Sequence, residues 1–320
     1  MPESGVRIHI TGVVQGVGFR PFVYGLAQRY LLTGWVRNTS AGVDIEADGS
    51  SEALQSFTEA LAAESPPLAR IDSIEIADRP ADGFTTFEII QSAPVSGAFQ
   101  PVSPDVSVCD DCLRELMDPE DRRYRYPFIN CTNCGPRFTI IKDIPYDRPQ
   151  TTMAPFEMCE ACASEYQDPL DRRFHAQPVA CPDCGPQIWL ETIHQEQAWP
   201  KGEEALQTAR QMLSEGKILA VKGLGGFHLA CDAGNEAAVV ELRRRKLRVD
   251  KPFAVMVADE TAVAGHCRLD EHERRLLNSR ERPIVVLRRR ANSAIVPQVA
   301  PRSKYTGCNV ALYAITPSST

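Results

Sequence analysis

Residues 109–136, CDDCLRELMDPEDRRYRYPFINCTNCGP, are repeated as residues 159–186, CEACASEYQDPLDRRFHAQPVACPDCGP. The two copies lie fifty positions apart and share DP, DRR, CGP and four cysteines each. Within a copy, two C-x-x-C pairs are separated by eighteen residues. The eight cysteines are Cys109, Cys112, Cys131, Cys134, Cys159, Cys162, Cys181 and Cys184. This doubled pattern decides how the middle of the chain is organised.

The spacing of the cysteines predicts metal binding. Two residues between thiols let a tight turn present both sulfurs to one ion, and two such turns supply four thiolates in a tetrahedron. We therefore expect two structural zinc ions in closed four-cysteine knuckles. A disulfide framework, a redox motif and a rubredoxin-like iron site are the alternatives. Pairing within each copy is the simplest arrangement, and a crossed one stays open. His175 replaces Arg125 of the first copy, so it is not expected to be a necessary ligand.

The composition sets limits on the class of protein. A length of 320 residues suggests two or three domains. The net charge of −7 gives no nucleic-acid footprint, so RNA or DNA binding is disfavoured. The start has no secretory signal pattern, and no apolar run approaches the roughly 20 residues of a membrane span. Eleven cysteines without a signal favour a cytoplasmic location, and Cys231, Cys267 and Cys308 are expected to be buried or incidental thiols.

The first 90 residues alternate between strand and helix patterns. Period-two alternation and β-branched residues predict strands, whereas apolar residues at three- and four-residue spacing predict helices. The expected strands are 6–13, 34–38, 43–49, 71–78 and 84–90, and the expected helices are 20–32 and 50–64. The order β-α-β-β-α-β is that of the ferredoxin-like split unit.

The segment QGVGFR, residues 15–20, has the chemistry of a phosphate cradle. Gly16 and Gly18 allow a loop whose amides turn inward, and the following helix offers its positive end. Arg20 could donate two hydrogen bonds to phosphate oxygens. A simple turn with a solvated arginine is the alternative when this segment is taken alone.

The context of this segment resembles the acylphosphatase family over residues 5–91. The resemblance rests on GVVQGVGFRPFVYGLA, followed by GWVRN. It implies that Arg20 binds the phosphate and that Asn38 holds the attacking water. It also implies that no side chain becomes acylated, so that catalysis depends on positioning water and stabilising phosphoryl charge. The phosphate-binding loop would be Gln15, Gly16, Val17, Gly18 and Phe19.

Residues 91–104 are rich in proline, serine and glycine and are expected to be a linker. In the repeat that follows, Arg122, Arg123, Arg172 and Arg173 stand beside aspartates. Paired surface charges that support each knuckle are the simpler interpretation. A basic lining for an anion path is the alternative.

After about residue 199, strand and helix patterns alternate again, which predicts a mixed α/β domain. Helices are expected at 203–216, 235–246 and 270–278, and strands at 217–223, 252–259 and 283–289. KGLGGFHLACDA, RRRKLRVDKPFAVM and RPIVVL resemble the start of the YrdC-type nucleotide-binding domain. The candidate nucleotide-binding residues are Gly225, Gly226, His228, Lys246, Arg248 and Lys251.

Together the three parts resemble one family, HypF, the carbamoyltransferases of nickel–iron hydrogenase maturation. The resemblance implies an α+β multidomain chain with an acylphosphatase-like domain at 1–93, a double four-cysteine zinc-finger domain at 105–190 and a YrdC-like domain at 198–320. It implies hydrolysis of carbamoyl phosphate, reaction of carbamate with ATP (with Mg²⁺) to carbamoyl-adenylate, and transfer to the terminal cysteine of HypE. It further implies that the transferred group is dehydrated on the acceptor to give the cyanide ligand of the hydrogenase iron.

The chain also departs from this family pattern. It ends at Thr320, and residues 300–320 fit poorly where an apolar GVMLPYTP-like run is expected. We therefore expect an incomplete YrdC-like domain, from a truncation, frameshift or fragment, with weak or absent adenylate formation. A zinc-dependent nucleotide or nucleic-acid binding module and a plain acylphosphatase with inert appendages are the competing interpretations.

Overall fold

The computed structural model describes residues 4–97, 101–191, 200–223 and 225–310. The chain forms two compact units, which we describe separately. The first consists of Met1–Val106 and Phe128–Pro186, and the second of Ser107–Pro127 and Gln187–Thr320. Residues 311–320, which contain much of the unusual C-terminal sequence, lie outside the described residues.

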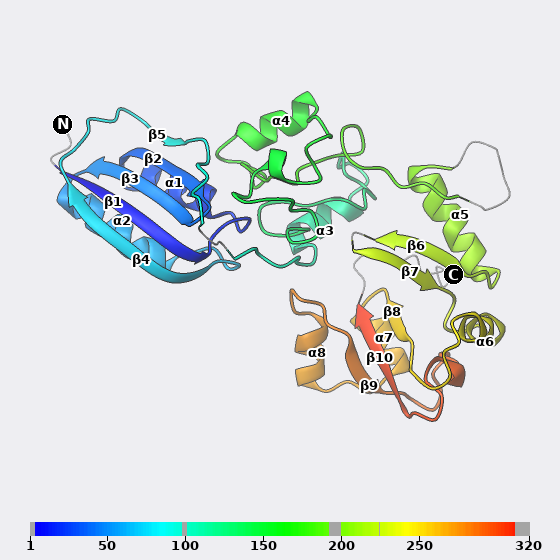
Figure 1. Cartoon of the computed structure of the whole chain (residues 1–320). Helices are drawn as coiled ribbons and strands as arrows, with labels where there is room; N and C mark the ends of the chain where they lie inside the picture. The colour runs from blue at the N-terminus through cyan, green and yellow to red at the C-terminus, as the bar shows by residue number, and fades with distance from the viewer. Residues whose placement is uncertain (1–3, 98–100, 192–199, 224, 311–320) are drawn as a thin grey trace. The chain divides into compact units, whose positions relative to one another are not determined.

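The first unit contains a five-stranded sheet whose elements follow the predicted order (Figure 1). These elements are β1 (Ser4–Val13), α1 (Phe19–Arg29), β2 (Thr33–Thr39), β3 (Gly42–Gly49), α2 (Ser51–Ala63), β4 (Arg70–Arg79) and β5 (Phe87–Ile89). The strand order is β4-β1-β3-β2-β5, with β5 parallel to β2 and the other pairs antiparallel. The ferredoxin-like prediction is therefore confirmed.

Both helices cover one face of this sheet, and the core lies between them and the strands (Figure 1). On β1, Val6, Ile8 and Ile10 point into the core, as the period-two pattern requires. The predicted apolar face of α2 is buried, and this helix begins where the Ser50 hydroxyl accepts a hydrogen bond from the amide of Ala53. Burying one large apolar side chain contributes about 1.5–3 kcal/mol, so this face fixes the helix on the sheet.

The second cysteine copy also lies in the first unit. Helix α4 (Glu160–Gln167) begins directly after Cys159, and the short 3-10 helix η1 (Arg148–Gln150) precedes it. A small core forms around Cys162, Val179 and Cys181. Arg173 is buried and donates to the carbonyl of Asn130, so the expectation of surface charges was wrong for this arginine. Its burial is tolerated because a backbone carbonyl accepts from the guanidinium.

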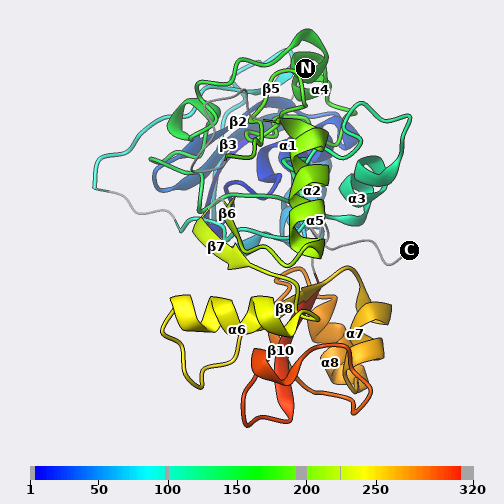
Figure 2. The same cartoon turned by 90° about the vertical axis from the view of Figure 1, so that its right-hand side faces the viewer.

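The second unit is a mixed α/β structure, as predicted. Its elements are α3 (Asp110–Met117), α5 (Gly202–Ser214), β6 (Leu219–Gly223), β7 (Gly226–Ala230), α6 (Glu236–Arg245), β8 (Ala254–Val257), α7 (Glu260–His266), α8 (Glu271–Leu277), β9 (Val285–Arg288), η2 (Pro297–Val299) and β10 (Tyr305–Val310). Strands β6 and β7 form a hairpin packed on α5 (Figure 2). Strand β10 lies between β8, to which it is parallel, and the antiparallel β9. The sequence patterns did not predict α3, β7, α7 or β10.

Arg123 of the first cysteine copy, which belongs to the second unit, is also buried, so the surface-charge expectation fails here too. Cys267 and Cys308 are fully buried in the core of the three-stranded sheet, as predicted, with their sulfurs 3.7 Å apart. Among the described residues, no helix has both the length and the apolar character needed to cross a bilayer.

Candidate functional site

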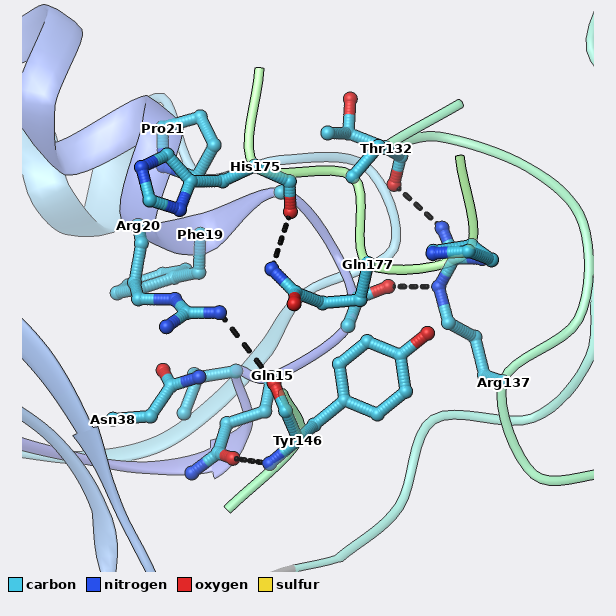
Figure 3. A pocket seen from close by; sticks show the side chains of 15 residues that line it. Gln15, Phe19, Arg20, Pro21, Asn38, Thr132, Arg137, Tyr146, His175 and Gln177 are labelled. Carbon is cyan, nitrogen blue, oxygen red and sulfur yellow. Dashed lines mark hydrogen bonds between the residues drawn. The ribbon is translucent and has the colours of Figure 1, made fainter. Parts of the chain in front are cut away.

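The connection from β1 to α1 forms the floor of a pocket in the first unit (Figure 3). Gly16 and Gly18 have φ angles of 72° and 75°, in the left-handed region that favours glycine. Gly18 caps α1, so Arg20 lies in the first helical turn, where free amides give an anion a positive environment. Arg20 is only 8 % exposed, and its head lines the pocket together with Asn38. The two predicted catalytic residues are thus brought together.

The guanidinium of Arg20 contacts groups from several segments. When the Asn38 amide is turned so that its oxygen faces Arg20, this oxygen accepts from Nε at 3.2 Å and from Nη2 at 3.3 Å. Nη2 also donates to the carbonyl of Tyr146 at 3.4 Å (Figure 3), and Nη1 donates to the Ser92 hydroxyl at 3.4 Å. The shortest contact joins Nη1 to Oδ1 of Asp147, at 2.8 Å.

Gln15 anchors the loop through its side chain. Its Nε2 donates to the carbonyls of Thr39, at 2.7 Å, and Gly42, at 3.0 Å. Its Oε1 accepts from the amide of Tyr146 at 3.0 Å (Figure 3). The amide group therefore ties the loop to the β2–β3 turn and to the segment between the two cysteine copies. The side chain is committed to this scaffold, which leaves only the backbone of Gln15 for an anion.

The rest of the pocket wall comes from the cysteine-rich part of the chain. Tyr146, His175 and Gln177 line it, and Tyr146 lies against the glycine loop beside Gln15 (Figure 3). Burial, with Arg20 nearby, lowers the pKa of His175 from 6.5 to about 4, so its ring is neutral at pH 7. Burial also raises the pKa of Tyr146, whose hydroxyl has no hydrogen-bond partner among the described residues. Sequence reasoning missed Tyr146, because nothing local marks it.

Arg137 is a second residue that the motifs did not reveal. It is 1 % exposed and donates to the carbonyl of Gly16 in the loop. Its Nη atoms donate to the carbonyls of Cys131, Thr132, Cys134 and Pro136 at 2.8–3.0 Å. A single guanidinium thus ties the second C-x-x-C turn of the first copy to the glycine loop. The one sequence signal was an arginine directly after CGP, where the second copy has Gln187.

The cysteines form two groups, each from one copy: Cys109, Cys112, Cys131 and Cys134, and Cys159, Cys162, Cys181 and Cys184. In each group the sulfurs lie within 4.8 Å of one another. Neighbouring sulfurs, such as those of Cys131 and Cys134, are 3.6–3.7 Å apart, close to the edge of about 3.8 Å that a tetrahedron with metal–sulfur bonds of about 2.3 Å would have. A hydrogen bond from the amide of Cys162 contributes most to lowering the pKa of Cys159 to about 7, which favours the ligating thiolate. The donor sets fit zinc.

The nucleotide-site candidates lie on two separate segments of the second unit. Gly225, Gly226 and His228 belong to the β6–β7 hairpin. Lys246, Arg248 and Lys251 follow α6. Arg248 donates to the carbonyls of Lys251 and Pro252, so its guanidinium serves to shape this segment.

Comparison with known families matches each part of the chain. The acylphosphatase model matches residues 6–89, and the model described as HypF finger matches 108–141 and 158–191. The model for Sua5, YciO and YrdC, described as telomere recombination, matches residues 211–316.

Individual relatives give the same picture. The carbamoyltransferase HypF2 of Cupriavidus necator is 54 % identical over 291 residues, which cover 89 % of this chain and 35 % of the relative. A solved structure of full-length HypF in the phosphate- and nucleotide-bound form has a TM-score of 0.89 and 47 % identity, covering 97 % of this chain and 40 % of that one. The acylphosphatase of Salinibacter ruber is 45 % identical over 89 residues, which cover 27 % of this chain and 93 % of that enzyme. The chain thus spans 33–40 % of the length of these HypF proteins.

Proposed function

Because the chain belongs to the HypF family, we propose that its glycine loop hydrolyses carbamoyl phosphate as the first step of a carbamoyltransferase reaction. The observation that carries this proposal is the meeting of Arg20 and Asn38 in one buried pocket above the Gly16–Gly18 loop. Phosphoryl chemistry without a covalent intermediate needs three groups. These are a helix N-terminus that binds an anion, a cation that can donate two hydrogen bonds to phosphate oxygens, and an amide.

In this mechanism the amides of residues 15–19 and the guanidinium of Arg20 bind the phosphate, and Asn38 orients the attacking water. The contacts of Arg20 with Asn38, Ser92 and the Tyr146 carbonyl are 3.2–3.4 Å long. Phosphate oxygens would replace such long contacts by shorter charged hydrogen bonds. His175 is neutral at pH 7 and adds no positive charge, and Arg137, which also lines the pocket, donates to backbone carbonyls, so we assign the charged contact with the substrate to Arg20.

A carbamoyl group fits the polar part of this pocket better than an alkyl acyl group. Tyr146 is 4 % exposed and places a hydroxyl without a partner, among the described residues, at the pocket wall. An unpaired buried hydroxyl costs about 1–3 kcal/mol, which a substrate amino or carbonyl group would offset. A small substrate with hydrogen-bonding groups on its acyl side is therefore favoured.

The later steps are proposed for the whole family protein, of which this chain spans a part. Carbamate would react with ATP, accompanied by Mg²⁺, in the YrdC-like part to give carbamoyl-adenylate. Gly225, Gly226, His228, Lys246, Arg248 and Lys251 are the candidate nucleotide ligands. The acceptor would be the terminal cysteine of a HypE-like protein, and the location the cytoplasm. The similar full-length HypF, solved in a phosphate- and nucleotide-bound form, supports a nucleotide step in this family.

We propose an acylphosphatase-like domain at residues 1–93, a double zinc-finger domain at 105–190 and a YrdC-like domain at 198–320. The three family matches fall within these ranges to one residue. Each cysteine group would hold one structural zinc ion, whose binding energy stabilises a knuckle too small to fold alone.

The test is phosphate release from carbamoyl phosphate by the intact chain. Arg20→Ala removes a guanidinium that can donate two hydrogen bonds to the phosphate. We therefore expect kcat/KM to fall roughly 100- to 1000-fold, which corresponds to about 3–4 kcal/mol of transition-state stabilisation. Asn38→Ala should lower kcat more than it raises KM, because Asn38 acts on water rather than on phosphate. Arg29→Ala is the matched control, since Arg29 is exposed on the same helix and its contacts, with Glu64 and the Tyr30 ring, lie outside the pocket.

Full activity in the Arg20→Ala variant would remove this arginine from the mechanism. If the wild-type chain binds phosphate but turns over no acyl phosphate, the pocket is a binding site, and a non-catalytic module becomes the better description.

A further inference from the structure

Asp147 lies outside the part of the chain that matches acylphosphatases, yet it contacts the central arginine of the pocket. Its Oδ1 is 2.8 Å from Nη1 of Arg20. The side chain of Arg20 is 9 % exposed and that of Asp147 is 26 % exposed, so water screens this pair only partly. The pair joins residues 127 positions apart, one at the start of α1 and one between the two cysteine copies.

The backbone on both sides of Asp147 is held firmly. The amide of Tyr146 donates to Oε1 of Gln15 at 3.0 Å. On the other side, Nη1 of Arg148 donates to the carbonyls of Gln177 and Val179 at 2.8 and 2.9 Å. Asp147 therefore stands between an anchor on the glycine loop and an anchor on the second knuckle, which fixes where its carboxylate points.

A purely local role does not account for this carboxylate. Asp147 is the N-cap residue of the 3-10 helix Arg148–Gln150, a position where aspartate side chains commonly accept from a helix amide. Here the side chain makes no capping hydrogen bond. It turns to Arg20 instead, although a negative charge beside a phosphate site repels the substrate. Because this repulsion opposes substrate binding, the carboxylate of Asp147 should have a role at Arg20 that offsets it.

We propose that Asp147 is a positioning residue for Arg20, supplied to the acylphosphatase-like site by the segment between the cysteine copies; this rests on the proposed function. The guanidinium is planar, so holding Nη1 by Asp147 while Asn38 contacts the Nε–Nη2 side fixes both its position and its plane. A preset plane aims the donors at the phosphoryl oxygens in the transition state. The carboxylate thus raises the rate and does not strengthen ground-state binding of phosphate.

The experiment uses the intact chain with Asp147→Ala and Asp147→Asn. Asp143→Asn is the matched control, because Asp143 lies on the same segment, is exposed, and its carboxylate accepts from the backbone amide of its neighbour Ile144. The measurements are kcat and KM for carbamoyl phosphate, the inhibition constant of inorganic phosphate, and thermal unfolding to correct for the folded fraction. A misplacement near 1 Å costs about 100-fold in rate, so Asp147→Ala should lose about 10- to 100-fold in kcat.

Under this proposal the inhibition constant of phosphate stays constant or decreases, because a repelling charge is gone. Asp147→Asn, which keeps a hydrogen-bond acceptor, should recover part of the rate. In the Arg20→Ala background, Asp147→Ala should cause no further loss, since it acts through Arg20.

Two results would overturn the inference while leaving the proposed function intact. One is an unchanged or higher kcat in Asp147→Ala together with tighter inhibition by phosphate. This result would show that the Asp147 carboxylate competes with phosphate for Arg20. The other is an equal loss with and without Arg20, which would make its role structural. Failure of the proposed substrate looks different: wild type would hydrolyse acetyl phosphate but not carbamoyl phosphate, and the same variants would then be compared on acetyl phosphate.

Discussion

Replacement of Arg137 by Met should weaken both the first knuckle and the glycine loop. The wild-type guanidinium donates to five backbone carbonyls, of Gly16, Cys131, Thr132, Cys134 and Pro136, while nearly inaccessible to water. Methionine matches the length and the apolar stem but donates nothing. The variant therefore tests the hydrogen bonds separately from the packing.

The magnitude follows from these contacts. A hydrogen bond from a charged donor contributes about 1.5–3 kcal/mol, but carbonyls can keep a second partner and water can enter. The loss should be nearer that of breaking one buried charged network, about 3–5 kcal/mol. For a unit of this size, about 2–4 °C of melting temperature is lost per kcal/mol, so the midpoint should fall by about 6–20 °C.

The assay combines thermal unfolding of the zinc-loaded chain with phosphate inhibition of acyl phosphate hydrolysis. Arg137→Met should lower the melting temperature and raise the inhibition constant, because the Gly16 carbonyl loses its clamp. Arg70→Met is the control: Arg70 is exposed on β4 and pairs with Asp72, so its loss should change stability by less than about 0.5 kcal/mol. An Arg137→Met variant as stable as the control would refute the reasoning.

Three further changes have defined outcomes. Cys131→Ser removes one thiolate from its group, so metal analysis should find one zinc ion per chain in place of two; iron, or no metal in wild type, would contradict the zinc assignment. Because the folded pKa of His175 is about 4 and the unfolded value 6.5, the unfolded chain binds more protons between these values. The free energy of unfolding should therefore fall by about 2–3 kcal/mol from pH 6.5 to pH 4, and His175→Gln should flatten that slope. Tyr146→Phe should raise KM for carbamoyl phosphate several-fold without destabilising the fold, since its hydroxyl has no protein partner among the described residues. An equal rise in KM for acetyl phosphate would show that the hydroxyl does not bind the amino group of carbamoyl phosphate.

The elements that sequence patterns predicted are those with a strong local period. Strand β1 alternates in burial from Val6 to Val13, and α2 has both a serine cap and an apolar face. Helices α3 and α7 and strands β7 and β10 were missed. Helix α7 has Val263 as its one buried residue, and β10 depends on pairing with strands distant in sequence. Local patterns carry no information about such partners.

The same distinction separates the predicted from the unpredicted site residues. Arg20 and Asn38 belong to a motif in which sequence neighbours share one loop and one strand. Tyr146 and Arg137 meet that loop only through the tertiary fold, across 131 and 121 residues. Charge also misled the interpretation: arginines are usually solvated, but Arg173 is buried, where a distant carbonyl accepts from it and the Glu165 carboxylate lies 3.8 Å away.

These long-range contacts bear on how the two parts of the first unit depend on each other. The acylphosphatase of Salinibacter ruber is matched over 93 % of its length by 89 residues of this chain, so the match leaves no room in it for a cysteine-rich segment like residues 105–190. In this chain, however, Gln15, Gly16 and Arg20 each bind a residue from that segment. Metal binding contributes the free energy that folds such a knuckle. Loss of a ligand cysteine should therefore alter the positions of Arg137 and Tyr146, which hold the loop. The phosphate site should therefore respond to the metal state of the knuckles although no cysteine lies in it, a coupling that a free acylphosphatase has no means to show.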